Sequence, residues 1–155
     1  MKQISLQQIF ALISAGVVLG LSASEILVGF GSPFPLSPTS LAVTLLAIGA
    51  GVYFASLPIA KYRKTREQGV ESRRPNPFIA VRILAFARAC VITSAGFTGW
   101  HLGLLLWLWL FGSLVENLVV STLVSTVSSL AMLLASYLAE LNCRAPKDPD
   151  GEAQS

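Results

Sequence analysis

Charged side chains are scarce in this 155-residue chain. Asp, Glu, Lys and Arg occupy 12% of positions and apolar residues 54%, whereas soluble domains carry roughly a quarter of charged residues. Several apolar stretches also contain no Lys or Arg. These stretches are close in length to the ~20 residues that a helix needs to cross a bilayer. This composition excludes an ordinary soluble globule and predicts a single domain embedded in a membrane.

Residues that bind metals or act as catalysts are also rare. His101 is the one histidine, and the two cysteines, Cys90 and Cys143, have no metal-ligand spacing. The sequence contains no His-Glu-x-x-His, no Gly-x-Ser-x-Gly and no phosphate-binding glycine loop. We therefore expect no cofactor and no metal, and a protein that is not an enzyme.

Four apolar segments remain, and their lengths predict membrane spans at about residues 6–30, 41–60, 83–111 and 118–139. Ser5 and Gln8 have the spacing of a capping box before the first span. The third helix is expected to start at Pro77 and to extend past the bilayer at its cytoplasmic end. The predicted fold is all-α, a transmembrane bundle of four helices in residues 1–145, followed by a disordered cytoplasmic tail in residues 146–155.

Positive charge is absent from one side of this four-span topology, because all eleven Lys and Arg residues fall on the other. The positive-inside rule then places both termini and the basic loop, residues 61–77, in the cytoplasm. Trp107 and Trp109 fall near the outer end of the third span, a position typical of an aromatic belt. The predicted location is the cytoplasmic membrane.

The N-terminus allows a second interpretation. Lys2, the apolar stretch and Leu21-Ser22-Ala23 resemble a cleavable signal peptide. The apolar run nevertheless continues to Phe30, beyond such a cut, as a complete span requires. The sequence therefore favours an uncleaved first helix.

Small residues recur along each span, and membrane helices associate where such residues let their backbones approach. The predicted helix-packing positions are Gly16, Gly20, Gly51, Gly96, Gly99, Gly103 and Ser125. They could join the helices within one chain, or they could form an interface with a second copy or a partner protein.

Ionisable residues inside a span are costly and therefore mark candidate functional positions. Glu25 is either an interfacial carboxylate or a group that carries a proton or cation. Arg88 lies about one turn inside the cytoplasmic boundary, so it either anchors the helix there or contacts a substrate. His101 lies near the middle of the third run, where it either hydrogen-bonds a Ser or Thr of the Ser-rich fourth span or relays protons.

The loop of residues 61–77 dominates the electrostatics, with six basic and two acidic residues. Its basic residues are candidates for contact with anionic lipids: Lys61, Arg63, Lys64, Arg66, Arg73 and Arg74. Nucleic acid is not an expected partner, because the segment is tethered to the membrane and lacks interleaved aromatic residues beyond Tyr62.

Several of these features occur together in one family. Arg82, Arg88, the segment Gly99-Trp-His-Leu-Gly103 and the ending Glu140-Leu-Asn-Cys-Arg-Ala-Pro146 resemble an uncharacterised actinobacterial membrane family, a domain of unknown function often encoded near folate-biosynthesis genes. The resemblance implies four spans and an uncleaved first helix, and it brings no assigned activity. The chain departs from that pattern in its Ser-rich fourth span and at Asn142.

Two classes of function fit the sequence. A structural or accessory membrane protein needs packing faces and a recognition loop, and the chain has both. A small proton-coupled or ion-coupled transporter needs an ionisable group facing a cavity, commonly with internal repeats or a broken helix. The two halves of the chain share no clear similarity, so the sequence favours the accessory role.

Overall fold

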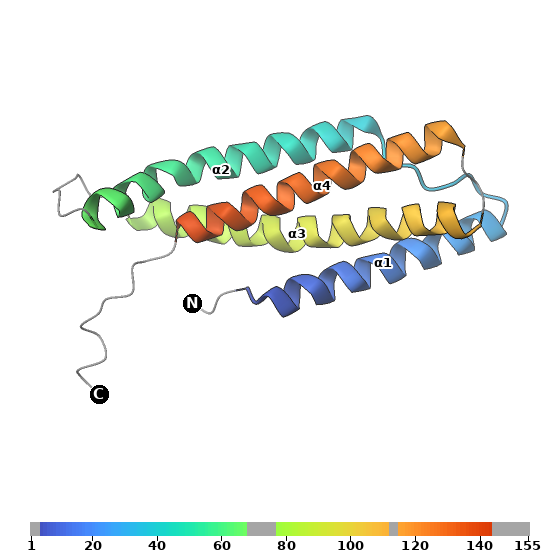
Figure 1. Ribbon diagram of the computed structural model, residues 1–155, viewed down its shortest axis with the longest axis horizontal. Helices are drawn as coiled ribbons and strands as arrows, with labels where there is room; N and C mark the ends of the chain where they lie inside the picture. Colours follow the sequence, from blue (N-terminus) through green and yellow to red (C-terminus); the bar gives the residue numbers. More distant parts are fainter. Residues whose placement is uncertain (1–3, 68–76, 112–114, 144–155) are drawn as a thin grey trace.

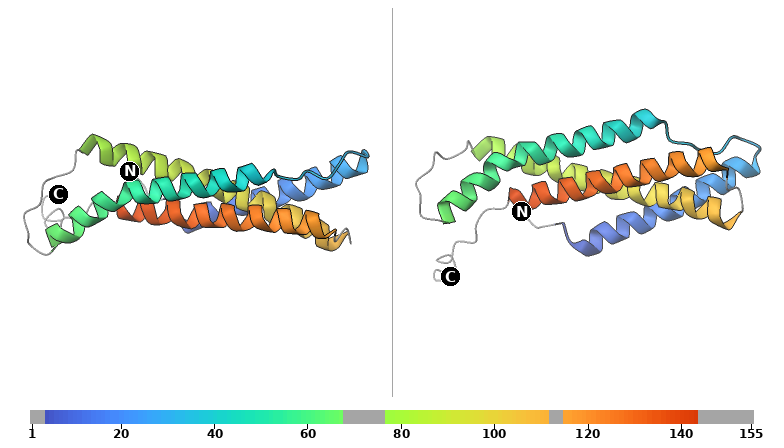
Figure 2. Two further views of the ribbon diagram at one scale, coloured as in Figure 1. Left: turned by 90° about the horizontal axis from the view of Figure 1, so that it is seen from above. Right: turned by 45° about the horizontal axis from the view of Figure 1, so that its top comes forward.

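Four long helices make up the computed structural model of the chain, which describes residues 4–67, 77–111 and 115–143. They are α1 (Leu6–Gly29), α2 (Thr39–Glu67), α3 (Pro77–Leu110) and α4 (Glu116–Asn142). Helix α1 packs along α3, α3 along α4, and α4 along α2, while α2 and α3 touch much less (Figures 1 and 2). The described residues contain no strand, so the all-α prediction is confirmed.

All four helices are long and apolar enough to cross a membrane. Their outer faces expose large apolar side chains that water would disfavour, among them Phe10 at 67%, Phe54 at 64% and Trp109 at 72% exposure. Lipid is the solvent that suits such a surface. The chain is a multi-pass helical membrane protein, as its composition predicts.

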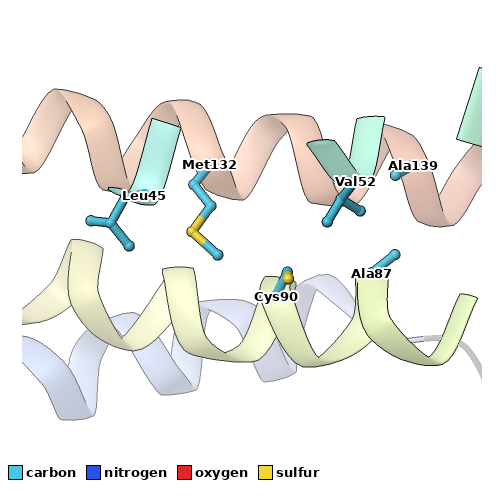
Figure 3. Packing of buried hydrophobic residues seen from close by; sticks show 6 residues of the cluster. All are labelled: Leu45, Val52, Ala87, Cys90, Met132 and Ala139. Carbon is cyan, nitrogen blue, oxygen red and sulfur yellow. The ribbon is translucent and has the colours of Figure 1, made fainter. Parts of the chain in front are cut away.

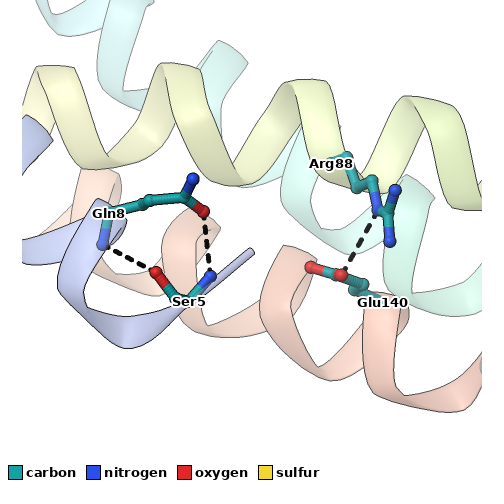
Figure 4. Close-up of polar contacts among 4 residues, drawn as sticks. All are labelled: Ser5, Gln8, Arg88 and Glu140. Atoms are coloured by element: carbon teal, nitrogen blue, oxygen red, sulfur yellow. Dashed lines mark hydrogen bonds and ion pairs between the residues drawn. The ribbon is translucent and has the colours of Figure 1, made fainter. Parts of the chain in front are cut away.

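The helix boundaries agree with the sequence at two points and differ at a third. Ser5 and Gln8 form the predicted capping box, each side chain bonding the other's backbone N–H (Figure 4), and α3 begins at Pro77. Helix α2, however, continues through Pro58 to Glu67, so the predicted loop of residues 61–77 is helical in its first part. Lys, Arg and Glu are good helix formers, which accounts for the continuation.

The main apolar core lies where α2, α3 and α4 meet (Figure 3). It is built from Leu45, Val52, Ala87, Cys90, Met132 and Ala139. A second cluster joins Ile9 of α1 to Val91 and Ala95 of α3 and to Leu133 of α4. Polar contacts between helices lie toward the two ends of the bundle, on either side of these clusters.

Candidate functional site

Glycines bring α1 and α3 into backbone contact. A Cβ atom added to Gly16 would lie 2.6 Å from the carbonyl oxygen of Gly96 and 2.9 Å from Cα of Gly99. One added to Gly20 would meet the backbone of Trp100 and lie 3.3 Å from Cα of Gly103. Only glycine fits at such an approach, and two Gly-x-x-x-Gly segments therefore face each other in parallel.

The other predicted packing positions differ. Gly51 is exposed, and a Cβ there would meet nothing within 4 Å, so Gly51 packs against no other helix of the described residues. Gly49 packs against Met132 instead, because two residues of helix rotate a side chain to the opposite face. Gly96 contributes its carbonyl oxygen to the α1 contact but has open space on its Cβ side, and Ser125 is buried in α4.

His101 is completely buried in the half of the bundle that holds the connection between α1 and α2. Its Nε2 lies 2.8 Å from Oγ of Ser37, in the connection between α1 and α2, and its ring stacks on Phe97. Ser121 of the fourth helix donates to the Ser37 carbonyl at 3.4 Å. The α4 hydroxyl therefore contacts Ser37 and not His101 itself, the partner expected from the sequence. His101 joins the α1–α2 connection to α3.

Glu25 lies at the same end and is exposed, yet it faces α3. The indole N–H of Trp107 donates to its Oε2 at 2.8 Å. Trp107 itself is only 6% exposed and contacts Phe34 and Phe111, so Trp109 alone of the predicted pair turns outward. No carboxylate of the described residues lies within ion-pair distance of His101.

Arg88 belongs to a buried ion pair at the opposite end. Its Nε lies 3.3 Å from Oε1 of Glu140, the last acidic residue of α4 (Figure 4). The Glu140 side chain is 1% exposed and that of Arg88 18%. The second oxygen of Glu140, Oε2, is buried without a hydrogen-bond partner among the described residues. Arg88 is thus paired within the protein, which sequence reasoning did not foresee.

Further polar contacts join α2 to the end of α4 beside this pair. Arg63 donates from Nη1 to the Leu141 carbonyl at 3.0 Å. The Asn142 amide donates to Ser56 Oγ at 3.1 Å, and Ser56 donates to the Tyr53 carbonyl. We call Arg63, Arg88, Glu140, Asn142 and Ser56 the polar clamp, because they join α2, α3 and α4 at one end.

A sequence signal for Glu140 does exist. Ser129, Leu133 and Ser136 are all buried and recur at helical spacing, and Glu140 is the next position on that face. Extending the stripe by one turn places a carboxylate inside the bundle. Its partner Arg88 cannot be inferred from the same pattern.

Several of the hydroxyls buried along the helices bond locally. Ser94 donates to the carbonyl of Cys90, Thr98 to that of Ser94, and Thr126 to that of Thr122, at 2.6 to 2.8 Å. Such bonds satisfy the hydroxyl within its own helix. Ser136 of α4 is the exception, because its buried Oγ has no hydrogen-bond partner among the described residues.

The basic residues of α2 lie at the same end as the polar clamp. Lys61 and Lys64 are exposed, and Arg63 is partly buried in its contact with α4. Side-chain details of Arg66, and all of Arg73, Arg74 and residues 146–155, lie outside the described part of the chain.

No metal centre forms within the described residues, which contain no group of three His, Cys, Asp or Glu side chains close enough to hold an ion. Cys90 and Cys143 are free and buried. The arrangement is thus a pair of polar contact sites, His101 with Ser37 at one end and the polar clamp at the other.

Comparison with known proteins places the whole bundle in one family. No curated protein and no solved structure matches the chain. One family model matches residues 9–147, from the first turn of α1 to beyond α4, and its description is "Protein of unknown function (DUF3180)". The chain belongs to this family of proteins of unknown function.

Proposed function

We propose that the protein is a structural or accessory component of the cytoplasmic membrane rather than an enzyme. The observation that carries this proposal is the local bonding of Ser94, Thr98 and Thr126, whose buried hydroxyls donate to carbonyls of their own helices instead of lining a shared polar path. The polar clamp and the His101–Ser37 contact then serve to fix helices and a connection in place. The bilayer and another membrane protein are the expected partners, and nucleic acid is not.

A proton-coupled or ion-coupled transporter is the second candidate, and the buried, unpartnered oxygen of Glu140 favours it. His101 lies 13 residues beyond Arg88 on α3, or about 20 Å along the helix. A proton relay between the two ends would need groups to bridge that length. The two α3 hydroxyls in between, those of Ser94 and Thr98, donate to carbonyls of their own helix, which supports the accessory role.

Replacing His101 with Gln tests the choice between the two functions. Gln keeps a hydrogen-bonding side chain for Ser37 but cannot carry a proton. We expect H101Q to insert, to fold and to complement a strain that lacks the protein. Complementation and the elution volume in mild detergent are the measurements. A folded, inserted H101Q protein that fails to complement would favour proton-coupled transport.

The proposed orientation places both termini and the basic end of α2 in the cytoplasm. The start of α1, the end of α4 and the basic end of α2 all lie at the same end of the bundle (Figure 1). This common position supports the proposed orientation. An actinobacterial source and a gene position near folate biosynthesis stay expectations of the sequence resemblance.

Reporter fusions test the orientation. Fusions at Lys64 and after residue 155 are expected to read cytoplasmic, and a fusion at Ser113 external. The reason is that loops rich in Lys and Arg stay on the cytoplasmic side of the membrane. A fusion at Gly31 is the control, since it lies at the end without Lys or Arg and should match Ser113. An external signal at the C-terminus would contradict the proposed orientation.

A further inference from the structure

A groove opens between α2 and α3 in the half of the bundle that holds the polar clamp. It has a volume of about 270 Å³ and is lined by Gly51, Val52, Ala55, Arg82, Ile83 and Phe86. The missing side chain of Gly51 leaves space on the exposed face of α2. Since the two helices touch little, their outer faces leave this hollow open to the surrounding lipid.

Arg82 is the one charged residue of the lining, and it is exposed. It has no ion-pair partner among the described residues, in contrast to Arg88, six positions later on the same helix, which is paired with Glu140. Arg82 comes just before the predicted third span, residues 83–111, at the level expected for lipid headgroups. Its guanidinium is therefore available to a negatively charged group of the membrane surface.

The depth of Arg82 suits a lipid phosphate. Ala55, which shares the groove with Arg82, lies 16 residues along α2 from Thr39, or about 24 Å. The hydrocarbon core is ~30 Å thick, and the arginine stem can extend its head toward the nearer interface. Apolar lining and a cation at the interface match the two parts of an anionic phospholipid.

We propose that this groove binds one anionic phospholipid, with an acyl chain over Gly51 and Ala55 and the phosphate at Arg82. The larger groove between α1 and α3, about 460 Å³, is lined by Leu12, Ala15, Gly16, Leu19, Ile92, Thr93, Gly96, Phe97 and Trp100 and has no charged residue. That groove accepts lipid tails without a preference for headgroup charge. The proposed site is separate from the exposed basic residues at the end of α2.

Binding of phosphatidylglycerol and phosphatidylcholine to the full chain, compared by native mass spectrometry from mild detergent, tests the proposal. The unmodified chain is expected to prefer phosphatidylglycerol. R82Q should lower that preference about fivefold to tenfold, because it removes the one cation of the groove. K64Q is the matched control: it removes an equal charge from the exposed basic end of α2, outside the groove, so its loss of preference measures diffuse attraction alone and should be much smaller than that of R82Q.

Filling the groove gives an independent test of the acyl-chain position. Leucine at Gly51 or at Ala55, both exposed, should weaken phosphatidylglycerol binding, whereas leucine at Ala50, exposed but outside the lining, should not. Equal losses in R82Q and K64Q would overturn the proposal in favour of diffuse attraction to the basic end. Full binding in both G51L and A55L, or displacement of the lipid by inorganic phosphate alone, would overturn it as well.

Discussion

Leucine at both position 16 and position 20 is expected to detach α1 from α3 and to lower the free energy of unfolding by about 3 kcal/mol or more. The reason is that the atoms in the way are backbone atoms: the Gly96 carbonyl, Cα of Gly99 and the peptide of Trp100. A side chain can rotate out of a clash, but a helix backbone can yield only by moving the whole helix. Thermal unfolding in mild detergent measures the loss.

The matched control is leucine at Gly29, on the same helix. A Cβ there would meet nothing within 4 Å, so G29L should unfold like the unmodified chain. The same experiment bears on oligomer formation, because the face that carries Gly16 and Gly20 is covered by α3 of the same chain. If the double leucine variant keeps its thermal stability, the described α1–α3 contact is wrong.

The sequence predicts the fold well because lipid imposes simple rules. Span number, the Ser5 capping box and the start of α3 at Pro77 follow from hydropathy and from local backbone chemistry. Those signals act over a few residues or over one helix. They do not depend on which helices become neighbours.

Contacts between helices are predicted less well, because a periodic pattern identifies a face but not what covers it. The stripe of Ala47, Gly51 and Ala55 has the same spacing as that of Gly16 and Gly20, yet all three residues are exposed. The partner of His101 is Ser37, 64 residues away in a connection without regular structure. No local rule relates two such positions.

The burial of the charged residue Glu140 is also difficult to predict from the sequence. Counted from the end of its span it belongs to the interface, but helical spacing places it inside, beside Ser136. Its burial is acceptable only because Arg88 arrives from another helix. A buried charge pair therefore requires the fold before it can be recognised.

The Arg88–Glu140 pair yields the second large effect, and the effect is expected to be asymmetric. Methionine at Arg88 leaves a carboxylate that is 1% exposed without its cation, at a cost of about 3 to 5 kcal/mol. Leucine at Glu140 should cost less, because the Arg88 side chain is already 18% exposed and can extend to the interface. Thermal unfolding of both variants in mild detergent measures the difference.

The double variant R88M/E140L separates a structural role of the pair from a transport role. Replacing both charges with apolar groups of similar size removes the unpaired charge as well as the attraction, so its stability should return close to that of the unmodified chain. An accessory protein needs only the packing of α3 on α4, and the folded double variant should then complement a strain that lacks the protein. A transporter that uses the free oxygen of Glu140 would lose its activity in the same folded variant. If the two single losses are equal and simply add in the double variant, the two residues are not coupled, and the ion pair does not hold α3 to α4.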